Sequence, residues 1–380
     1  MDFDLSEEQG LIADNVARLM KDKYSFEKRN GYRNGPLGFS EELWAQYAAM
    51  GLLGAAFSEQ DGGYGGGAVE RMLISEAFGR SLALEPYLAS VVLAGGAVRH
   101  AGSMEQRAAL IGGVASGELR LALAHAERAA GWNPHDVATS ATKDGAGFTL
   151  NGEKGLVIHG DSAQKLIVLA RTAGGRRERS GLGLFVVDAH AEGVSRRGYE
   201  TQDGQRAAEI GFANVRAEDV LGDPEGAAAA LEATLDEAIA ALCAEAVGAM
   251  SEATEMTADY LKTRKQFGVA IGSFQALQHR AADMIVALEQ ARSMMYYATM
   301  TASETDAEAR SRAMSAAKAQ IGRSAKFIGQ QATQLHGGIA MTYEYKLGHL
   351  FKRMAMIDIS YGDADYHLQK LGAGQGLFAA

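Results

Sequence analysis

The sequence predicts an α+β multi-domain fold, with a helical domain at residues 1–120, an antiparallel β domain at 121–225 and a helical bundle at 226–380. Three observations support this prediction. The 380 residues include only four prolines against 46 glycines, and helix-forming Ala, Leu, Met and Glu are frequent. From Leu121, short apolar segments separated by glycine turns replace the helical pattern. After Gly222-Asp223-Pro224, long helical patterns return.

The N-terminal domain is predicted from helix caps and apolar spacing. Residues 6–23 open with Ser6 and Gln9 in the spacing of a capping box, and apolar side chains follow at helical intervals. A second helix is predicted from Ser40 to Met50. The segment 61–67 holds five glycines, which predicts a loop, and helices resume near residue 69 and continue to about residue 116.

The middle and last domains differ in the period of their apolar residues. Strand-like segments, separated by glycine or Asn-Gly turns, are predicted at 138–150, 165–171, 181–188 and 207–220. Long helical patterns are predicted at 228–265, 274–303, 307–335 and 344–356. Four long helices predict a bundle.

Composition excludes several classes of function. A formal net charge of -10 without a basic patch argues against binding nucleic acid. The nine histidines lack metal-ligand spacing, so no metal site is predicted. The sequence contains no nucleophile elbow, P-loop or dinucleotide fingerprint. The one cysteine, Cys243, lies in an alanine-rich helical pattern, which favours a small core residue in a reducing compartment.

No targeting or membrane segment is predicted. The first four residues are acidic and lack the pattern of an export signal or transit peptide. The most apolar stretch, Leu82 to Val98, is too short and too polar to span a bilayer. A cytoplasmic protein without a membrane anchor is expected.

Five short motifs occur in a fixed order along the chain. They are Glu59 to Gly65, Asn151-Gly152-Glu153-Lys154, Asp203-Gly204-Gln205-Arg206, Arg264 to Gly268 with Phe274-Gln275, and Gln334 to Gly338. In this order they resemble the acyl-CoA dehydrogenase family over essentially the whole chain. The resemblance implies an N-terminal helical domain, a middle antiparallel β-barrel domain, and a C-terminal four-helix bundle that binds FAD and forms oligomers.

The resemblance also implies the FAD contacts. The residues expected at the pyrophosphate and adenosine, commonly those of a neighbouring subunit's FAD, are Arg264, Phe267, Gln275, Gln334, Gly337 and Gly338. A guanidinium offers fixed donors to a diphosphate, and paired glycines let the backbone approach a nucleotide. The alternative is that Arg264 lies in a solvated basic run and that Gly337-Gly338 is only a helix C-cap.

The activity implied is α,β-desaturation of an acyl-CoA, as in fatty acid or dicarboxylic acid degradation. A carboxylate base removes the α-proton while the β-hydrogen leaves as hydride to the flavin. An electron-transfer flavoprotein or a similar acceptor is the expected electron partner, and the oligomer is a homotetramer or a heterotetramer with a homologous subunit.

The sequence departs from the family where the base is expected. In much of the family the base is the glutamate of a Tyr-Glu-Gly-Thr phrase, which here reads Tyr361-Gly362-Asp363-Ala364. Asp363 is the candidate catalytic residue, but it lies one position away, about 100° around a helix. Some members carry the base on the first bundle helix, where Ala238 stands here.

A second departure concerns the flavin ring. The family's Trp-Ile-Thr is replaced by the aliphatic segment 156–158, and its Thr-Glu-Pro-x-Ala-Gly-Ser-Asp loop survives only in fragments between His125 and Asp136. Contacts to adenosine persist while those to the ring and the base are changed.

This asymmetry leads to the hypothesis that the chain pairs with a catalytically complete homologue and lends contacts to its FAD. The chain looks most like the small subunit of pimeloyl-CoA dehydrogenase and related two-subunit members. A subunit that turns over by itself, a non-catalytic partner subunit, and a flavin-independent acyl-CoA-binding module remain alternatives.

Overall fold

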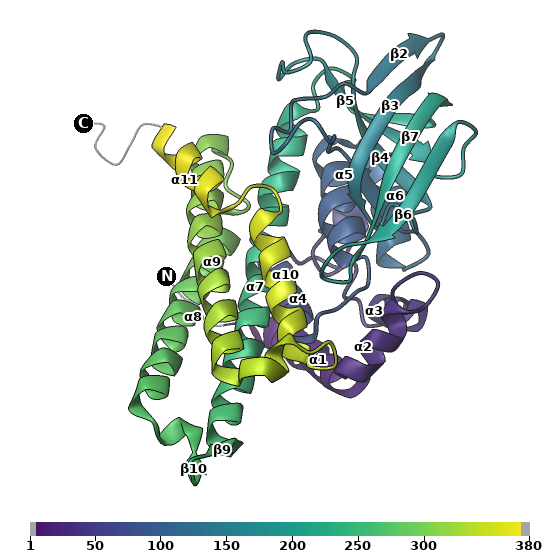
Figure 1. Ribbon diagram of the computed structural model, residues 1–380. Coiled ribbons are helices and arrows are strands. Elements are labelled where there is room, and N and C mark those ends of the chain that lie inside the picture. Colours follow the sequence, from purple (N-terminus) through teal and green to yellow (C-terminus); the bar gives the residue numbers. More distant parts are fainter. Residues whose placement is uncertain (1–4, 374–380) are drawn as a thin grey trace. The chain divides into compact units, whose positions relative to one another are not determined.

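The computed structural model describes residues 5–373, which group into two compact units (Figure 1). The helical unit comprises residues 5–30, 68–83 and 239–373. The sheet unit comprises residues 31–67 and 84–238.

Serine side chains cap several of the helices that precede the first strand. Ser6 forms a capping box with Gln9 at the start of the first helix, and the Ser40 side chain caps the third, so both predicted starts are confirmed. The helices are α1 (Glu7–Lys23), α2 (Phe26–Arg33), α3 (Glu41–Ala49), η1 (Glu59–Asp61), α4 (Ala68–Ser81), η2 (Tyr87–Gly95), α5 (Gly96–Ala101) and α6 (Met104–Ala115). The apolar stretch predicted not to span a membrane contains η2, a π-helix that is almost entirely buried.

The sheet unit holds an eight-stranded sheet. Its strands are β1 (Leu121–Ala124), β2 (Ser140–Asp144), β3 (Gly147–Ile158), β4 (Lys165–Arg171), β5 (Leu182–Asp188), β6 (Val194–Glu200), β7 (Arg206–Arg216) and β8 (Asp219–Leu221). They pair in the order β6-β7-β3-β2-β4-β5-β8, with β1 on β4. Most pairs are antiparallel, as predicted, but β1 and β2 each run parallel to β4.

The structure corrects the predicted turn at Asn151-Gly152. These residues lie inside β3, where the register with β7 shifts between Leu150 and Gly152. A Cβ at Gly152, which has φ 146°, would lie 2.6 Å from the Thr139 Cα, so only glycine permits this close approach. The hairpin between β2 and β3 instead turns at Gly145, which has φ 59°.

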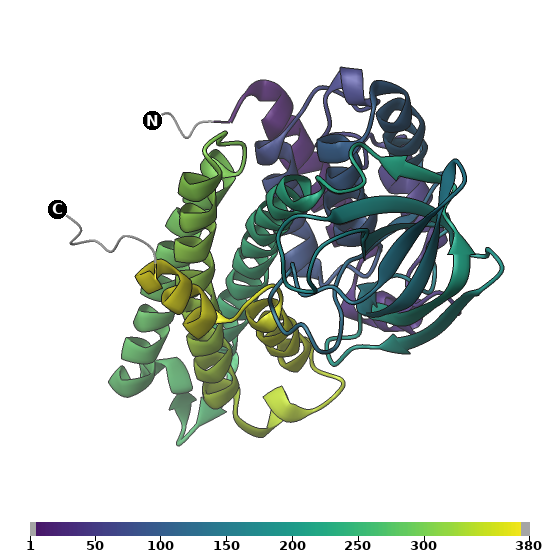
Figure 2. The ribbon, with the colours of Figure 1, turned by 90° about the horizontal axis from the view of Figure 1, so that it is seen from above.

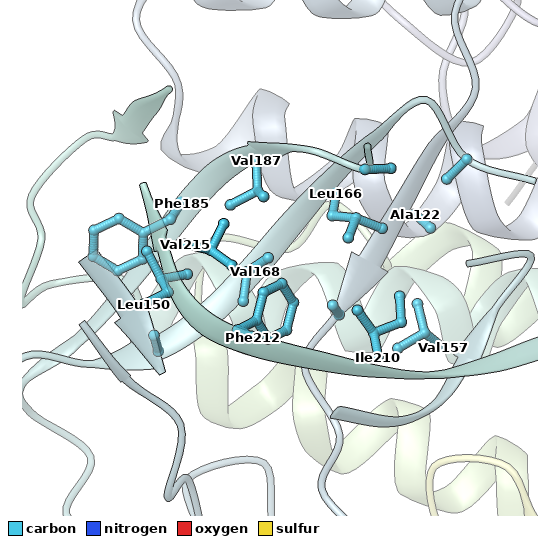
Figure 3. Close-up of a cluster of buried hydrophobic side chains, with 14 of the residues drawn as sticks. Ala122, Leu150, Val157, Leu166, Val168, Phe185, Val187, Ile210, Phe212 and Val215 are labelled. Carbon is cyan, nitrogen blue, oxygen red and sulfur yellow. The ribbon is translucent and has the colours of Figure 1, made fainter. Parts of the chain in front are cut away.

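Apolar side chains that alternate along the strands form a hydrophobic core in the sheet unit. Figure 3 shows side chains from different strands meeting in one cluster, with Phe185, Phe212 and Ile210 among its largest members. Phe185 is fully buried and Phe212 is 4% exposed. Burial of one such side chain contributes about 1.5 to 3 kcal/mol, so the cluster stabilises the scaffold that carries the adjoining loops.

Long helices and one small hairpin make up the rest of the described chain. These elements are α7 (Ala228–Thr263), β9 (Lys265–Gln266), β10 (Val269–Ala270), η3 (Ile271–Ser273), α8 (Gln275–Thr301), α9 (Ala307–His336), η4 (Gly337–Met341), α10 (Lys346–Ile359) and α11 (Ala364–Ala373). The predicted helices at 228–265, 274–303, 307–335 and 344–356 are confirmed as α7 to α10, whereas α11 was not predicted. Figure 2 shows α7, α8 and α9 side by side.

Helices α4 and α7 cross at glycines within the helical unit. A Cβ at Gly79 would lie 1.9 Å from the Glu245 carbonyl oxygen, and one at Gly248 would lie 1.9 Å from that of Glu76. Backbone therefore packs on backbone at this crossing. The crossing fixes the N-terminal helix α4 against the bundle.

Candidate functional site

The β9–β10 hairpin presents an exposed aromatic ring in a strained conformation. Phe267 and Gly268 form a two-residue turn with φ values of 54° and 82°, flanked by the pair Gln266 and Val269. Phe267 is 91% exposed. A left-handed conformation at a residue with a side chain costs about 1 to 2 kcal/mol. The Phe267 ring meets Phe274 edge to face with a centroid separation of 6.1 Å, but most of its surface stays in water and gains little from burial. Such strain, held in an exposed position, is typical of a binding site.

The end of α9 presents accessible backbone. A Cβ added to Gly337 or Gly338 would meet no atom within 4 Å, and Gly337 has φ 67°. Gly337 also closes α9, since its N–H donates to the Thr333 carbonyl oxygen. The predicted C-cap role is therefore present, but it leaves the glycine backbone open to a ligand.

A ring stack joins these two features. His336, the residue before Gly337, stacks on Tyr260 of α7 with a centroid separation of 4.4 Å. Arg264 lies one turn beyond Tyr260 and its N–H donates to the Tyr260 carbonyl oxygen at 2.8 Å. The structure thus brings the segment that begins at Arg264 and the segment that ends at Gly338 to the same end of the helical unit.

The chemistry of this end fits the adenosine and diphosphate of FAD. The six predicted contacts are all solvent-exposed: Arg264, Phe267, Gln275, Gln334, Gly337 and Gly338. Within the described residues, no side-chain hydrogen bond engages Arg264, Gln275 or Gln334. A guanidinium, an aromatic surface, free amides and open glycine backbone together suit a dinucleotide.

Asp363, the candidate base, begins helix α11. Its Oδ1 accepts a hydrogen bond from the Tyr366 N–H at 2.8 Å, which is the arrangement of a helix N-cap. Gly362, at the family's glutamate position, has φ 110°. A Cβ there would lie 2.3 Å from the Tyr366 Cδ1, so a glutamate at 362 would be strained and would require the Tyr366 ring or the backbone to move.

Two buried side chains, which the sequence analysis missed, hold the loop between α10 and α11. The Lys318 ammonium on α9 donates to the carbonyl oxygens of Asp358 at 2.6 Å and of Gly362 at 2.7 Å. His367 Nε2 lies 3.1 Å from the Tyr361 carbonyl oxygen, which can only accept, so Nε2 carries the proton. Burial and Lys318 lower the pKa of His367 to about 4, and burial lowers that of Lys318.

The carboxylates on α7 also have cationic partners. Glu237 pairs with Arg99 and with His100 at 3.0 Å, and Ala238 beside it is fully buried. Glu245 accepts hydrogen bonds from Nε and Nη2 of Arg353, at 2.6 and 2.7 Å, in a buried ion pair. Neither glutamate is free to act as a base, because a glutamate that accepted a proton would leave its cationic partner without a counter-charge.

The segment expected near the flavin ring is aliphatic. Leu156 is 49% exposed with φ 50°, at a shift in register between Lys154 and Val157. Such bulges re-aim side chains near functional sites. Here Leu156 stands where the family's tryptophan packs near the flavin ring, and Ile158, at the place of the family's threonine, has no group that could hydrogen-bond a ring nitrogen.

A buried ion pair fixes the loop that precedes β2. The Lys154 ammonium lies 2.8 Å from Glu127 Oε1, and Glu127 also accepts the N–H groups of Ala138 and Thr139 at 2.8 and 2.9 Å. Burial lowers the pKa of Lys154 to about 8, although Glu127 opposes this shift. Glu127 belongs to the fragments of the family's flavin-side loop that remain in this sequence. In this structure its hydrogen bonds hold that loop in place.

Other classes of site gain no support from the described part of the chain. Within residues 5–373, no group of three His, Cys, Asp or Glu side chains is arranged to hold a metal ion. No helix in the same range has the length and apolar character needed to cross a membrane.

Comparison with known proteins gives matches along the whole chain. Three family profiles match: acyl-CoA dehydrogenase N-terminal domain at residues 6–118, middle domain at 122–220 and C-terminal domain at 225–375. Acyl-CoA dehydrogenase fadE12 from Mycobacterium tuberculosis is 31% identical over 313 residues, covering 80% of each chain.

Two solved structures extend the likeness to three dimensions. A variant of the steroid ACAD Tcur3481-Tcur3483 is 32% identical with a TM-score of 0.87, covering 96% of this chain and 97% of the other. The FAD complex of PigA is 26% identical with a TM-score of 0.88, covering 98% and 99%.

Proposed function

The chain belongs to the acyl-CoA dehydrogenase family of FAD-dependent oxidoreductases, and from this premise we propose that it is the FAD-lending subunit of a two-chain enzyme. The enzyme desaturates an acyl-CoA thioester between its α- and β-carbons. The homologous partner chain supplies the base that removes the α-proton. This chain supplies contacts to the adenosine side of the partner's FAD.

One observation carries the proposal: position 362 is a glycine whose conformation disfavours the glutamate that acts as base in much of the family. A side chain there would have a strained φ of 110° and would lie 2.3 Å from the Tyr366 ring unless the ring or the backbone moved. The other family position is Ala238, which has no acidic group. A complete reaction therefore needs a carboxylate from elsewhere.

The exposed end of the helical unit provides the residues that would bind FAD in this proposal. In the proposed complex, Arg264 pairs with the diphosphate, the Phe267 ring covers the nucleotide, and the Gly337 and Gly338 backbone lies against it. Bound FAD supplies the acceptor for the hydride that leaves the β-carbon. The strain at Phe267 is then offset by the contact it makes outside its own chain.

A second chain is supported by the asymmetry between the two sets of contacts. Residues for adenosine are exposed and open, whereas Leu156 at the ring side offers no hydrogen bond. A relative at 32% identity bears the paired name Tcur3481-Tcur3483, which supports an assembly of two different chains. We therefore propose a heterotetramer of two copies of each chain.

A self-sufficient homotetramer with Asp363 as base is the second candidate. It is favoured by the fact that Asp363 uses only Oδ1 in the helix cap, since no hydrogen bond among residues 5–373 engages Oδ2. A base must reach the α-proton through a free oxygen. Asp363 is the one acidic residue of the loop that meets this condition.

The remaining expectations belong to the same proposal. The three-domain division at residues 120 and 225 is supported by three profiles whose matches change near these positions. An electron-transfer flavoprotein or similar acceptor reoxidises the enzyme. A cytoplasmic location is supported by the one cysteine, Cys243, which is a buried free thiol.

The test compares the chain alone with the chain co-expressed with a homologous acyl-CoA dehydrogenase chain as the proposed partner. The flavin absorbance of each preparation is recorded, followed by anaerobic titration with several acyl-CoAs. We expect colour and bleaching only in the mixed complex. A chain that is yellow and bleaches alone would establish the homotetramer, and absence of bleaching in both would exclude dehydrogenation by this subunit.

A further inference from the structure

The loop between β4 and β5 is built around one buried guanidinium. Arg171, at the end of β4, is 9% exposed, and all three of its guanidinium nitrogens donate to backbone carbonyls. The acceptors, at 2.9 to 3.3 Å, are His135, Val137, Ala173, Arg176, Glu178 and Ser180. Four of these lie in the loop 172–181 itself, so its backbone is held in one conformation.

This fixed backbone displays two arginines that share one buried acid. Asp136 is only 2% exposed at its side chain, and its Oδ1 and Oδ2 accept the Nε–H of Arg176 and of Arg177, the second at 2.9 Å. The arginine side chains are 49% and 75% exposed. Within residues 5–373, no hydrogen bond engages the Nη atoms of either arginine.

The arrangement leaves two guanidinium forks facing solvent. Because Asp136 holds each arginine through Nε alone, the Nη pair of each remains available, with its direction set by the buried carboxylate. One carboxylate cannot neutralise two guanidinium groups, so an excess of positive charge stays here on a chain of net charge -10. A pre-organised double fork of this kind suits a phosphate.

The same loop contacts the first turns of α7. Arg179 donates to both oxygens of Glu232 at 2.7 and 2.8 Å, and His135 lies 3.0 Å from the same carboxylate. Ala238, where some family members carry the base, comes six residues after Glu232, about 9 Å along the helix axis. The loop that carries the forks is therefore bonded to the helix that carries Ala238.

We propose that Arg176 and Arg177 bind a phosphate of the coenzyme A portion of the thioester substrate. The inference rests on the proposed acyl-CoA chemistry, because the substrate class is what supplies the phosphates. Coenzyme A offers two sources, the 3′-phosphate and the diphosphate, and both present the same oxygens to a guanidinium. The site holds the nucleotide end of the substrate and takes no part in bond breaking.

Calorimetric titration of the full-length protein, in the oligomeric form in which it is isolated, tests this directly. The probes are coenzyme A, 3′-dephospho-coenzyme A and pantetheine. We expect coenzyme A to bind about 10-fold more tightly than pantetheine. A loss of that preference in 3′-dephospho-coenzyme A assigns the 3′-phosphate, and its retention assigns the diphosphate.

The variant Arg176→Gln/Arg177→Gln should bind all three probes equally. The matched control, Lys143→Gln/Arg216→Gln, removes two other exposed charges of the sheet unit and should keep the preference. If the first variant fails to fold because Asp136 is left unpaired, the triple variant with Asp136→Asn replaces it.

The proposal is overturned if the wild-type protein binds pantetheine as tightly as coenzyme A, or if the arginine variant keeps the preference. Binding is measured without turnover, so these outcomes do not depend on bleaching of the flavin. A protein that binds coenzyme A through the arginines but never bleaches would retain this site and lose the dehydrogenase proposal.

Discussion

Two regions of the helical unit use their polar groups in opposite ways (Figure 1). Around Arg264 and Gly338, side chains and backbone are exposed and make few contacts within the chain. In the loop between α10 and α11, the carbonyl oxygens of residues 358, 361 and 362 are all engaged by Lys318 or His367. The first region is open to solvent, whereas the backbone carbonyl oxygens of the second are bound within the chain.

The open region has residue types that suit a nucleotide, and the closed region has no glutamate at the family's base position. In the proposed function, a bound nucleotide offsets the strain at Phe267. A loop whose backbone carbonyl oxygens are held by buried donors gains stability but loses freedom to move during a reaction. Substitutions in the two regions should therefore differ in their effects on stability and on FAD binding.

The largest effect is expected for Gly362→Glu, which places a glutamate at the family's base position. The left-handed φ and the clash with Tyr366 should lower the free energy of unfolding by about 3 kcal/mol or more. No new bleaching by acyl-CoA is expected from the chain alone. Chemical denaturation and anaerobic titration measure the two results.

The matched control is Gly372→Glu, because an added Cβ at Gly372 meets no atom within 4 Å. That control should fold like the wild type. If Gly362→Glu were as stable as the control, position 362 would tolerate a side chain. If the flavin of the variant chain alone were bleached by acyl-CoA, the loop would be able to carry a working base.

Lys318→Met should have the next largest effect. Its loss leaves the carbonyl oxygens of Asp358 and Gly362 without their buried donor, which costs about 2 to 4 kcal/mol in unfolding free energy. Denaturant titration measures this change. The exposed Lys326→Met on the same helix is the control, and equal stability of the two variants would show that Lys318 does not hold the loop.

Arg264→Ala tests the open region. Since Arg264 is exposed and bonded to no other described side chain, stability should stay the same. Loss of its charged contacts to a diphosphate should weaken FAD binding to the mixed complex by about 10-fold to 100-fold. Flavin fluorescence measures the dissociation constant. Lys262→Ala, which removes an exposed charge on the same segment, should leave FAD affinity intact, and a similar loss there would refute a specific role.

Acid should open the closed region. His367 has a folded pKa of about 4 against a usual value near 6.5, lowered by burial, Lys318 and Lys370. Between these two values the unfolded chain binds more protons, so stability rises with pH and is lost as pH falls from about 6.5 toward 4. One such histidine contributes a slope of about 1.4 kcal/mol per pH unit in this window.

The slope is measured by denaturation at pH 5, 6 and 7. His367→Gln keeps a donor for the Tyr361 carbonyl oxygen and cannot titrate, so its slope should be shallower by that amount. His125, with a pKa lowered to about 4 by burial, titrates in the same window and stays in both proteins. Identical slopes in the wild type and in His367→Gln would show that His367 does not cause the pH dependence of stability.

Local signals made much of the fold predictable. The capping box at Ser6 and the break at Phe267-Gly268 are each set by residues close together in the sequence. The bulge at Gly152 was not predictable, because it depends on Thr139 of another segment. Strand β6 was missed as well, since only two of its seven residues are apolar by side chain and it lies at the end of the sheet.

The candidate site, like the fold, could be predicted only in part from the sequence. The adenosine-side residues could be named as candidates because each motif is short and its residues lie close together in the sequence, and their role stays a prediction. The hold of Lys318 on the loop was missed because its partners lie 40 and 44 residues away. A signal was present, since Lys318 lies one turn from both Met314 and Ile321, on a face of α9 that is otherwise apolar and buried.

The most direct test of the central claim is anaerobic acyl-CoA titration of the mixed complex carrying Asp363→Asn in this chain. Asparagine caps a helix about as well as aspartate, so the loop should keep its structure while losing the only candidate base it holds. We expect the flavin to bleach at the wild-type rate, because the partner chain supplies the base. Loss of bleaching with the fold intact would contradict the account and make Asp363 the catalytic residue.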